Sequence, residues 1–107
     1  MAGIDMIRSY MCQKIIIDGE IINTEFDFHC ALANALDFGV YYGNNTDALW
    51  DWLSSGMACG VCLYWKQSAV SQEKLGASFD VISDIFKRTK DRYQGKGADK
   101  EFNFILE

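Results

Sequence analysis

Two spacings of apolar residues follow one another in the first part of the chain and predict a strand and then a helix. The isoleucine-rich run at residues 14–17 leads into the turn-forming pair Asp18 and Gly19, which predicts a first strand. Thr24 is a typical helix N-cap, and apolar residues after it recur every four positions. We therefore expect a helix over residues 25–36.

The rest of the chain predicts further helices and two more strands. Asn44 or Asn45 can cap a second helix that runs to Leu53 and is ended by the Ser-Ser-Gly sequence after it. The continuous apolar run at residues 60–65 is typical of a strand buried on both faces. Strands separated by helices predict an α/β domain, a small three-stranded parallel sheet packed with about three to four helices. The remaining expected elements are helices over residues 68–75 and 77–93 and a last strand over residues 102–106.

Helical geometry sorts the side chains of the second predicted helix onto two faces. Asp47 and Asp51 are one turn apart and share a face, which Trp50 flanks, whereas Leu49 and Leu53 point toward the core. Like charges at this spacing destabilise an isolated helix slightly, and Asp47 recovers part of that cost from the helix dipole. Such a carboxylate pair can bind an external cation or form a solvated helix face. A catalytic pair is less favoured, because nothing in the sequence indicates that these carboxylates are buried.

Charge is distributed unevenly along the chain. Residues 15–65 contain seven acidic residues and no lysine or arginine, whereas the remainder contains ten basic and eight acidic residues. The net charge is −5 and the isoelectric point is about 4.7, whereas domains that bind nucleic acid usually carry a basic patch. We therefore expect a basic protein as partner, without direct binding to nucleic acid.

The length and composition suit one folded domain, since the chain has 107 residues and half of them are hydrophobic. No apolar run approaches the roughly 18 residues of a membrane-spanning helix. The first 13 residues lack the continuous apolar core of a signal peptide. We therefore expect a cytoplasmic protein that works without a membrane and without a cofactor.

The cysteines and the single histidine offer other chemistry. Without a secretion signal, Cys12, Cys30, Cys59 and Cys62 are expected to be reduced and packed in the core. Cys59 and Cys62 form a CxxC pattern, but a second ligand pair for zinc is missing and the pattern leads into a predicted strand. A redox or metal role is therefore the less favoured alternative. His29 falls within the first predicted helix and is expected to be a surface or half-buried residue.

One segment resembles the recognition motif of the barstar family, intracellular inhibitors of a secreted bacterial ribonuclease. Every defined position of the family pattern is present in Tyr41-Tyr42-Gly43-Asn44-Asn45-Thr46-Asp47-Ala48-Leu49-Trp50-Asp51. The similarity continues on both sides, at residues 16–20, 28–29, 63–67 and 102–106. The resemblance thus covers residues 14–107 as a single domain and leaves residues 1–13 as an N-terminal extension.

The resemblance implies an inhibitor that is not an enzyme and that binds one nuclease molecule. The second helix and the loop before it would enter the basic active site of the nuclease. Asp51 would be the main mimic of an RNA phosphate, paired with arginines and the catalytic histidine, and Asp47 would pair with a neighbouring basic group. Tyr41 would stack near that histidine. The other contacts implied by the family are Gly43, Asn45 and Trp50.

Three positions depart from the family pattern. Met57 replaces a tryptophan, Thr46 replaces a leucine, and Arg88 falls where the family inhibitor uses a glutamate against the enzyme. A cation at that place would repel a basic active-site rim, which suggests a different target, such as a nuclease toxin with this chain as its immunity protein. The alternative is a non-inhibitory interaction module of the same fold that binds another basic protein.

Overall fold

The computed structural model describes residues 13–36, 43, 45–97 and 100–107. Three strands, β1 (Gln13–Asp18), β2 (Val61–Lys66) and β3 (Asn103–Leu106), form a parallel sheet in the order β1-β2-β3. The predicted α/β class and the three-stranded parallel sheet are therefore confirmed.

The helices fall close to their predicted ranges. Thr24 precedes the first long helix as expected, and its hydroxyl accepts a hydrogen bond from the Asp27 backbone at 3.1 Å. The carboxylate of Asp27 in turn accepts from the Thr24 backbone at 3.2 Å, so the two residues cap the helix reciprocally. The helical elements are η1 (Gly19–Ile21), α2 (Glu25–Leu36), α3 (Thr46–Trp52), the π-helical turn η2 (Leu53–Met57), α4 (Ser68–Leu75) and α5 (Ala77–Tyr93).

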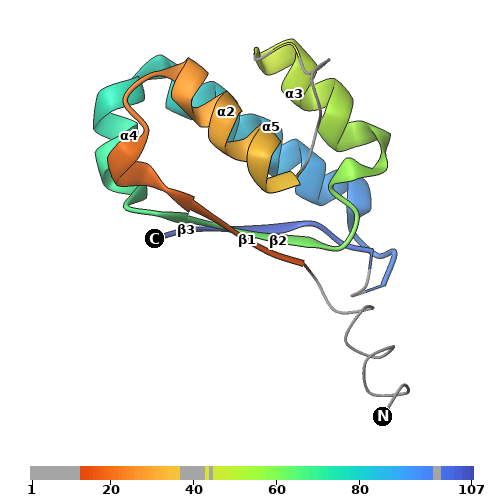
Figure 1. The fold of residues 1–107 in the computed structure, drawn as a ribbon. Helices are drawn as coiled ribbons and strands as arrows, with labels where there is room; N and C mark the ends of the chain where they lie inside the picture. Colours follow the sequence, from red (N-terminus) through yellow and green to blue (C-terminus); the bar gives the residue numbers. More distant parts are fainter. Residues whose placement is uncertain (1–12, 37–42, 44, 98–99) are drawn as a thin grey trace.

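All of these helices lie on one side of the sheet (Figure 1). The strand order follows the chain order, so both crossover connections step across the sheet in the same direction. Right-handed crossovers that step in one direction place their helices on one face. The prediction that β2 is buried on both faces is therefore wrong. Val61, Leu63 and Trp65 are buried, whereas the alternate residues of this strand are only half-buried.

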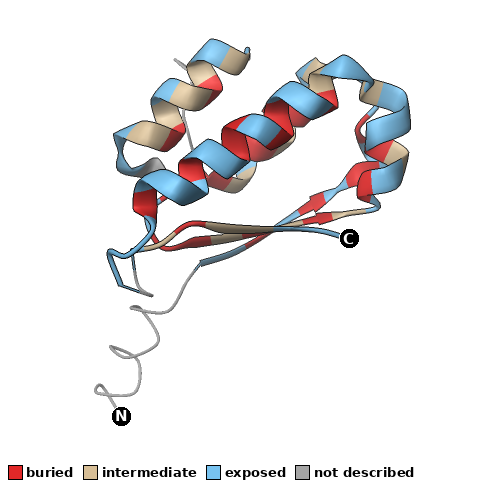
Figure 2. Ribbon diagram, turned by 180° about the vertical axis from the view of Figure 1, so that it is seen from behind, coloured by how far each residue is buried: buried red, intermediate tan, exposed pale blue. Residues whose placement is uncertain are grey.

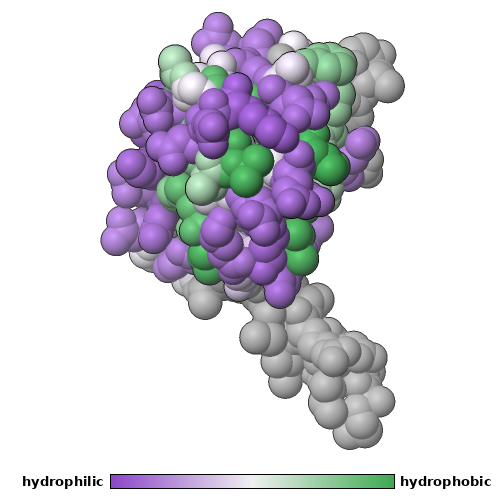
Figure 3. All heavy atoms as spheres, turned by 90° about the vertical axis from the view of Figure 1, so that its left-hand side faces the viewer, coloured by the Kyte–Doolittle hydropathy of each residue, from purple (hydrophilic) through white to green (hydrophobic). Residues whose placement is uncertain are grey.

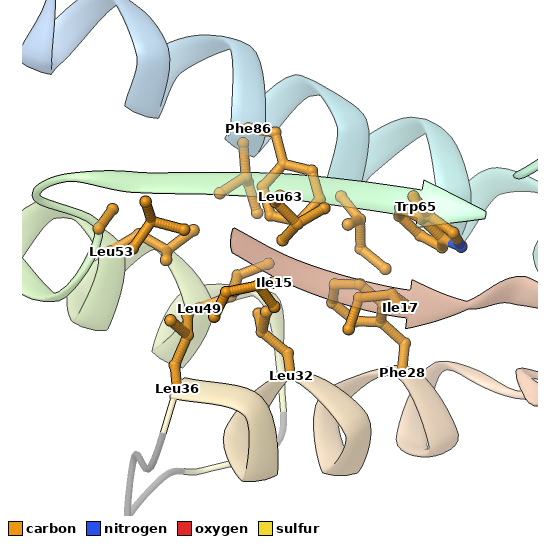
Figure 4. Close-up of a cluster of buried hydrophobic side chains, with 14 of the residues drawn as sticks. Ile15, Ile17, Phe28, Leu32, Leu36, Leu49, Leu53, Leu63, Trp65 and Phe86 are labelled. Carbon is orange, nitrogen blue, oxygen red and sulfur yellow. The ribbon is translucent and has the colours of Figure 1, made fainter. Parts of the chain in front are cut away.

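The core lies between the sheet and the helices (Figure 4). Phe28, Leu32 and Leu36 of α2 point toward Ile15 and Ile17 of β1. Figure 2 shows the same sorting along α5, where the buried positions follow the side that faces the sheet. Burying these side chains is the main source of stability, because each fully buried large apolar group contributes roughly 1.5–3 kcal/mol.

The other face of the sheet carries a row of partly exposed apolar residues. Ile16, Tyr64 and Ile105 are partners in the strand register, and Ile16 is 54% exposed. The ammonium group of Lys14 lies 4.7 Å from the ring centroid of Tyr64, and Lys66 forms an ion pair with Glu107. Charged side chains therefore border this apolar row.

Two sequence-based expectations about reactive side chains are corrected. His29 is fully buried, because it sits next to Phe28 on the side of α2 that faces the core, and it pairs with Glu25 at 3.0 Å. Cys59 is an exposed free thiol and Cys62 is disulfide-bonded, so the expectation of reduced core thiols fails at these two positions. Since Cys59 is free, the CxxC pattern does not form its own disulfide. Cys30 is a free, half-buried thiol, and Cys12 lies outside the described residues.

The outer surface around α4, seen in Figure 3, is mostly hydrophilic and carries separate small apolar patches. None of the described helices is long and apolar enough to cross a membrane.

Candidate functional site

The N-terminus of α3 is built by Asn45, which was predicted both as a possible cap and as a partner contact. Its side-chain oxygen accepts a hydrogen bond from the Ala48 backbone at 2.8 Å, and its backbone carbonyl accepts from Leu49 at 2.9 Å. Its side-chain amide donates to the carbonyl of Gly43 at 3.3 Å. Asn45 therefore fixes the direction in which α3 leaves the preceding loop.

The two faces of α3 separate as helical geometry predicted. Leu49 and, just beyond the helix, Leu53 have no exposed surface, whereas Asp47 and Asp51 are exposed. No hydrogen bond or ion pair joins either carboxylate to another residue in the part of the chain that the structure describes. The acidic face of α3, defined as Asp47 and Asp51, is thus directed to solvent.

Trp50 lies at the border of this face and is covered on one side by a cation. The guanidinium carbon of Arg88 on α5 lies 4.9 Å from the centroid of the Trp50 ring. The same guanidinium pairs with Asp84 one turn earlier on α5, at 3.2 Å. Stacking and pairing hold Arg88 beside Trp50, so this cation lies next to the acidic face without neutralising it.

The C-terminal end of α3 is held by contacts that the sequence did not reveal. The chain continues from Trp52 into η2 instead of ending as a helix at the predicted Ser-Ser-Gly sequence. The hydroxyl of Tyr93 donates to the carbonyl of Leu53 at 2.6 Å and accepts from the Gly56 backbone at 2.9 Å. Arg92 donates from Nε to the carbonyl of Ser54 at 2.9 Å. The end of α5 therefore anchors the turn on which α3 depends.

The other predicted contact residues are only partly described. Gly43 leaves little room for a side chain, because an added Cβ would lie 3.3 Å from both Ala48 Cβ and Asn45 Nδ2. Tyr41 lies outside the described residues. The structure thus brings together Asn45, Asp47, Trp50 and Asp51 on one short helix, with Gly43 at its entry.

Chemically, this site offers two exposed carboxylates, one aromatic ring and a rigid frame. Carboxylates held in this way suit hydrogen bonding to arginine and lysine of another protein, and arginine can bind a carboxylate through two parallel bonds. Tryptophan and arginine are also residue types enriched at the energetic centres of protein interfaces. The arrangement is therefore that of a binding surface for a basic partner.

Comparisons with known proteins agree on one family. The profile of the family described as "Barstar (barnase inhibitor)" matches residues 12–107. A protein of Bacillus subtilis (strain 168) named "Putative ribonuclease inhibitor YrdF" is 33% identical over 95 residues, which cover 89% of this chain and 99% of that protein.

Proposed function

The chain belongs to the barstar family, and from this premise we propose that it inhibits a basic ribonuclease or nuclease toxin by placing α3 in the enzyme's active site. The observation that carries the proposal is the acidic face of α3. Asp47 and Asp51 are exposed, while Leu49 on the opposite side of the same helix is completely buried. The helix can therefore present both carboxylates without losing its attachment to the core.

In the proposed complex, Asp51 takes the place of an RNA phosphate. Arginine side chains that normally bind the phosphate would form paired hydrogen bonds with its carboxylate, which strengthen when water is excluded. Asp47 binds a neighbouring basic group. Tyr41, Gly43, Asn45 and Trp50 complete the contact, and one inhibitor binds one nuclease.

This role requires no chemistry from the chain itself. As an inhibitor or immunity protein, it would act in the cytoplasm of a bacterium and protect the RNA of the cell from a nuclease that the cell or a competitor produces. The position of Arg88 beside Trp50 supports a target whose rim differs from that of barnase, because rim charges set the selectivity of such pairs.

The variant Asp51→Ala tests the proposal. Assayed against barnase and against a ribonuclease captured from the native host, the wild-type chain should inhibit at least one. Asp51→Ala should lose that inhibition, while its circular dichroism and thermal unfolding stay unchanged, since the residue is exposed and alanine favours helix. The matched control Glu73→Ala removes one exposed carboxylate from α4 and should inhibit normally.

A large effect is expected, about 4 kcal/mol or roughly a thousandfold in Kd. The family itself supplies the upper end of the known range, at the aspartate that matches Asp51, so this magnitude follows the family and not the geometry. Protection by Asp51→Ala equal to wild type would refute the assignment of α3. Binding of a basic protein without any loss of nuclease activity would favour the non-inhibitory module instead.

A further inference from the structure

A pocket of about 390 Å³ opens beside the acidic face, where the turn after α3 meets the end of α5 (right-hand side of Figure 1). Pockets of a few hundred Å³ are the usual size for small-molecule sites. The pocket is lined by Ser54, Ser55, Gly56, Cys59, Arg92, Tyr93, Lys96 and Lys100.

The charge of this pocket is opposite to that of α3. Arg92, Lys96 and Lys100 contribute three cations, and no carboxylate is among the described residues that line it. Arg92 is positioned by the hydrogen bond from Nε to the carbonyl of Ser54, which uses one of the five N–H donors of its guanidinium. The remaining donors are available for an anion, so a fixed cation stands beside two flexible ones.

The base of the pocket is rigid. Tyr93 is buried, and its hydroxyl joins the carbonyl of Leu53 to the backbone N–H of Gly56. Gly56 has a φ of +109°, a conformation that L side chains rarely adopt, and an added Cβ at this position would meet nothing within 4 Å. The glycine therefore both permits the turn and leaves the space beside it open.

We propose that this pocket is a binding site for a small phosphate-bearing anion. Three cations around one cavity are balanced better by a ligand with two or more negative charges than by a single carboxylate, and arginine and lysine are the usual phosphate ligands. The site lies beyond the acidic face of α3, and it stands whether or not the chain inhibits a nuclease.

Isothermal titration of the full-length chain with inorganic pyrophosphate, at constant ionic strength set with chloride, tests the site. One pyrophosphate should bind per chain with saturation. The double variant Lys96→Ala/Lys100→Ala should weaken this binding by about tenfold. The control Lys87→Ala/Lys90→Ala removes two exposed lysines of α5 that do not line the pocket, and it should bind as wild type does. Absence of saturable binding, or equal weakening in the two double variants, would overturn the proposal.

Cys59 provides a second readout inside the pocket, because it is an exposed free thiol. In a Cys30→Ser background, an aromatic disulfide with two carboxylates should react with Cys59 faster than a neutral pyridyl disulfide, relative to the same pair of reagents on free cysteine. Pyrophosphate should slow the reaction with the charged reagent, and Lys96→Ala/Lys100→Ala should remove the preference. No preference for the charged reagent in the unaltered pocket would also contradict an anion site.

Discussion

At the scale of single residues, His29 shows how burial changes a side chain that sequence pattern places on a helix surface. The imidazole is fully buried and lies 3.0 Å from the carboxylate of Glu25. Desolvation lowers the pKa of His29 below its ordinary value of 6.5, although the hydrogen bond and the charge of Glu25 act in the opposite direction. The folded protein therefore favours the neutral ring.

This shift predicts a pH dependence of stability. As the pH falls below about 6.5, the unfolded chain binds a proton at His29 that the folded chain does not bind, so the free energy of unfolding decreases until the lower folded pKa is reached. Urea unfolding at about pH 7.5 and about pH 5.5 should show this loss in the wild type. In His29→Gln the loss should be smaller, since the histidine term is absent and the carboxylates still titrate. An equal loss in both proteins would show that His29 does not contribute.

At the scale of elements, the contact between α3 and α5 sets the edge of the acidic face. Arg88 stacks on Trp50 and pairs with Asp84, which places a cation where a basic nuclease would approach. Charges at the rim of an interface act mainly on the association rate. Arg88→Glu should therefore raise the association rate with a basic nuclease several-fold, at a small cost in stability from the lost stacking.

Lys87→Glu is the matched control, since it makes the same change in net charge at the neighbouring exposed position of α5. Stopped-flow association should show a clearly smaller gain for this control. Equal gains in the two variants would mean that only total charge matters and that the place of Arg88 beside Trp50 has no role in partner choice.

Most elements could be predicted because their signals are local. The apolar spacing and the cap at Thr24 locate α2, and the i, i+4 relation of Asp47 and Asp51 is enough to put them on one exposed face. The covering of β2 could not be read from its own residues. It depends on the order of the strands, and an apolar run such as 61–65 suits one buried face as well as two.

The frame of the site was not predictable for a related reason. Tyr93 and Leu53 are 40 residues apart, and their hydrogen bond exists only after α5 has packed beside η2. The ion pair of Asp84 and Arg88 did have a local signal, the i, i+4 spacing of opposite charges on a helix, which was overlooked. The contact roles of Tyr41, Gly43, Asn45, Asp47, Trp50 and Asp51, and the boundary after residue 13, stay predictions.

At the scale of the whole molecule, acidic and basic groups occupy different regions. The acidic face of α3 is on one element, and the cations of Arg92, Lys96 and Lys100 surround a pocket at the end of another. All of the chain between residues 15 and 65 lacks lysine and arginine. The protein therefore has a directional charge distribution in addition to its net charge of −5.

Such a distribution predicts that association with a basic nuclease is steered by charge. The electrostatic attraction extends over roughly 10 Å at 0.1 M salt and over only about 3 Å at 1 M salt, so the association rate should fall by about tenfold or more across this range. The dissociation rate should change much less, because the contacts of Asp47 and Asp51 are desolvated once formed. Stopped-flow measurements on the wild type and on Asp47→Ala separate the two effects, since the variant should show a shallower salt dependence than Glu73→Ala. A flat profile for the wild type would mean that the acidic face acts only after contact, as a set of short-range hydrogen bonds.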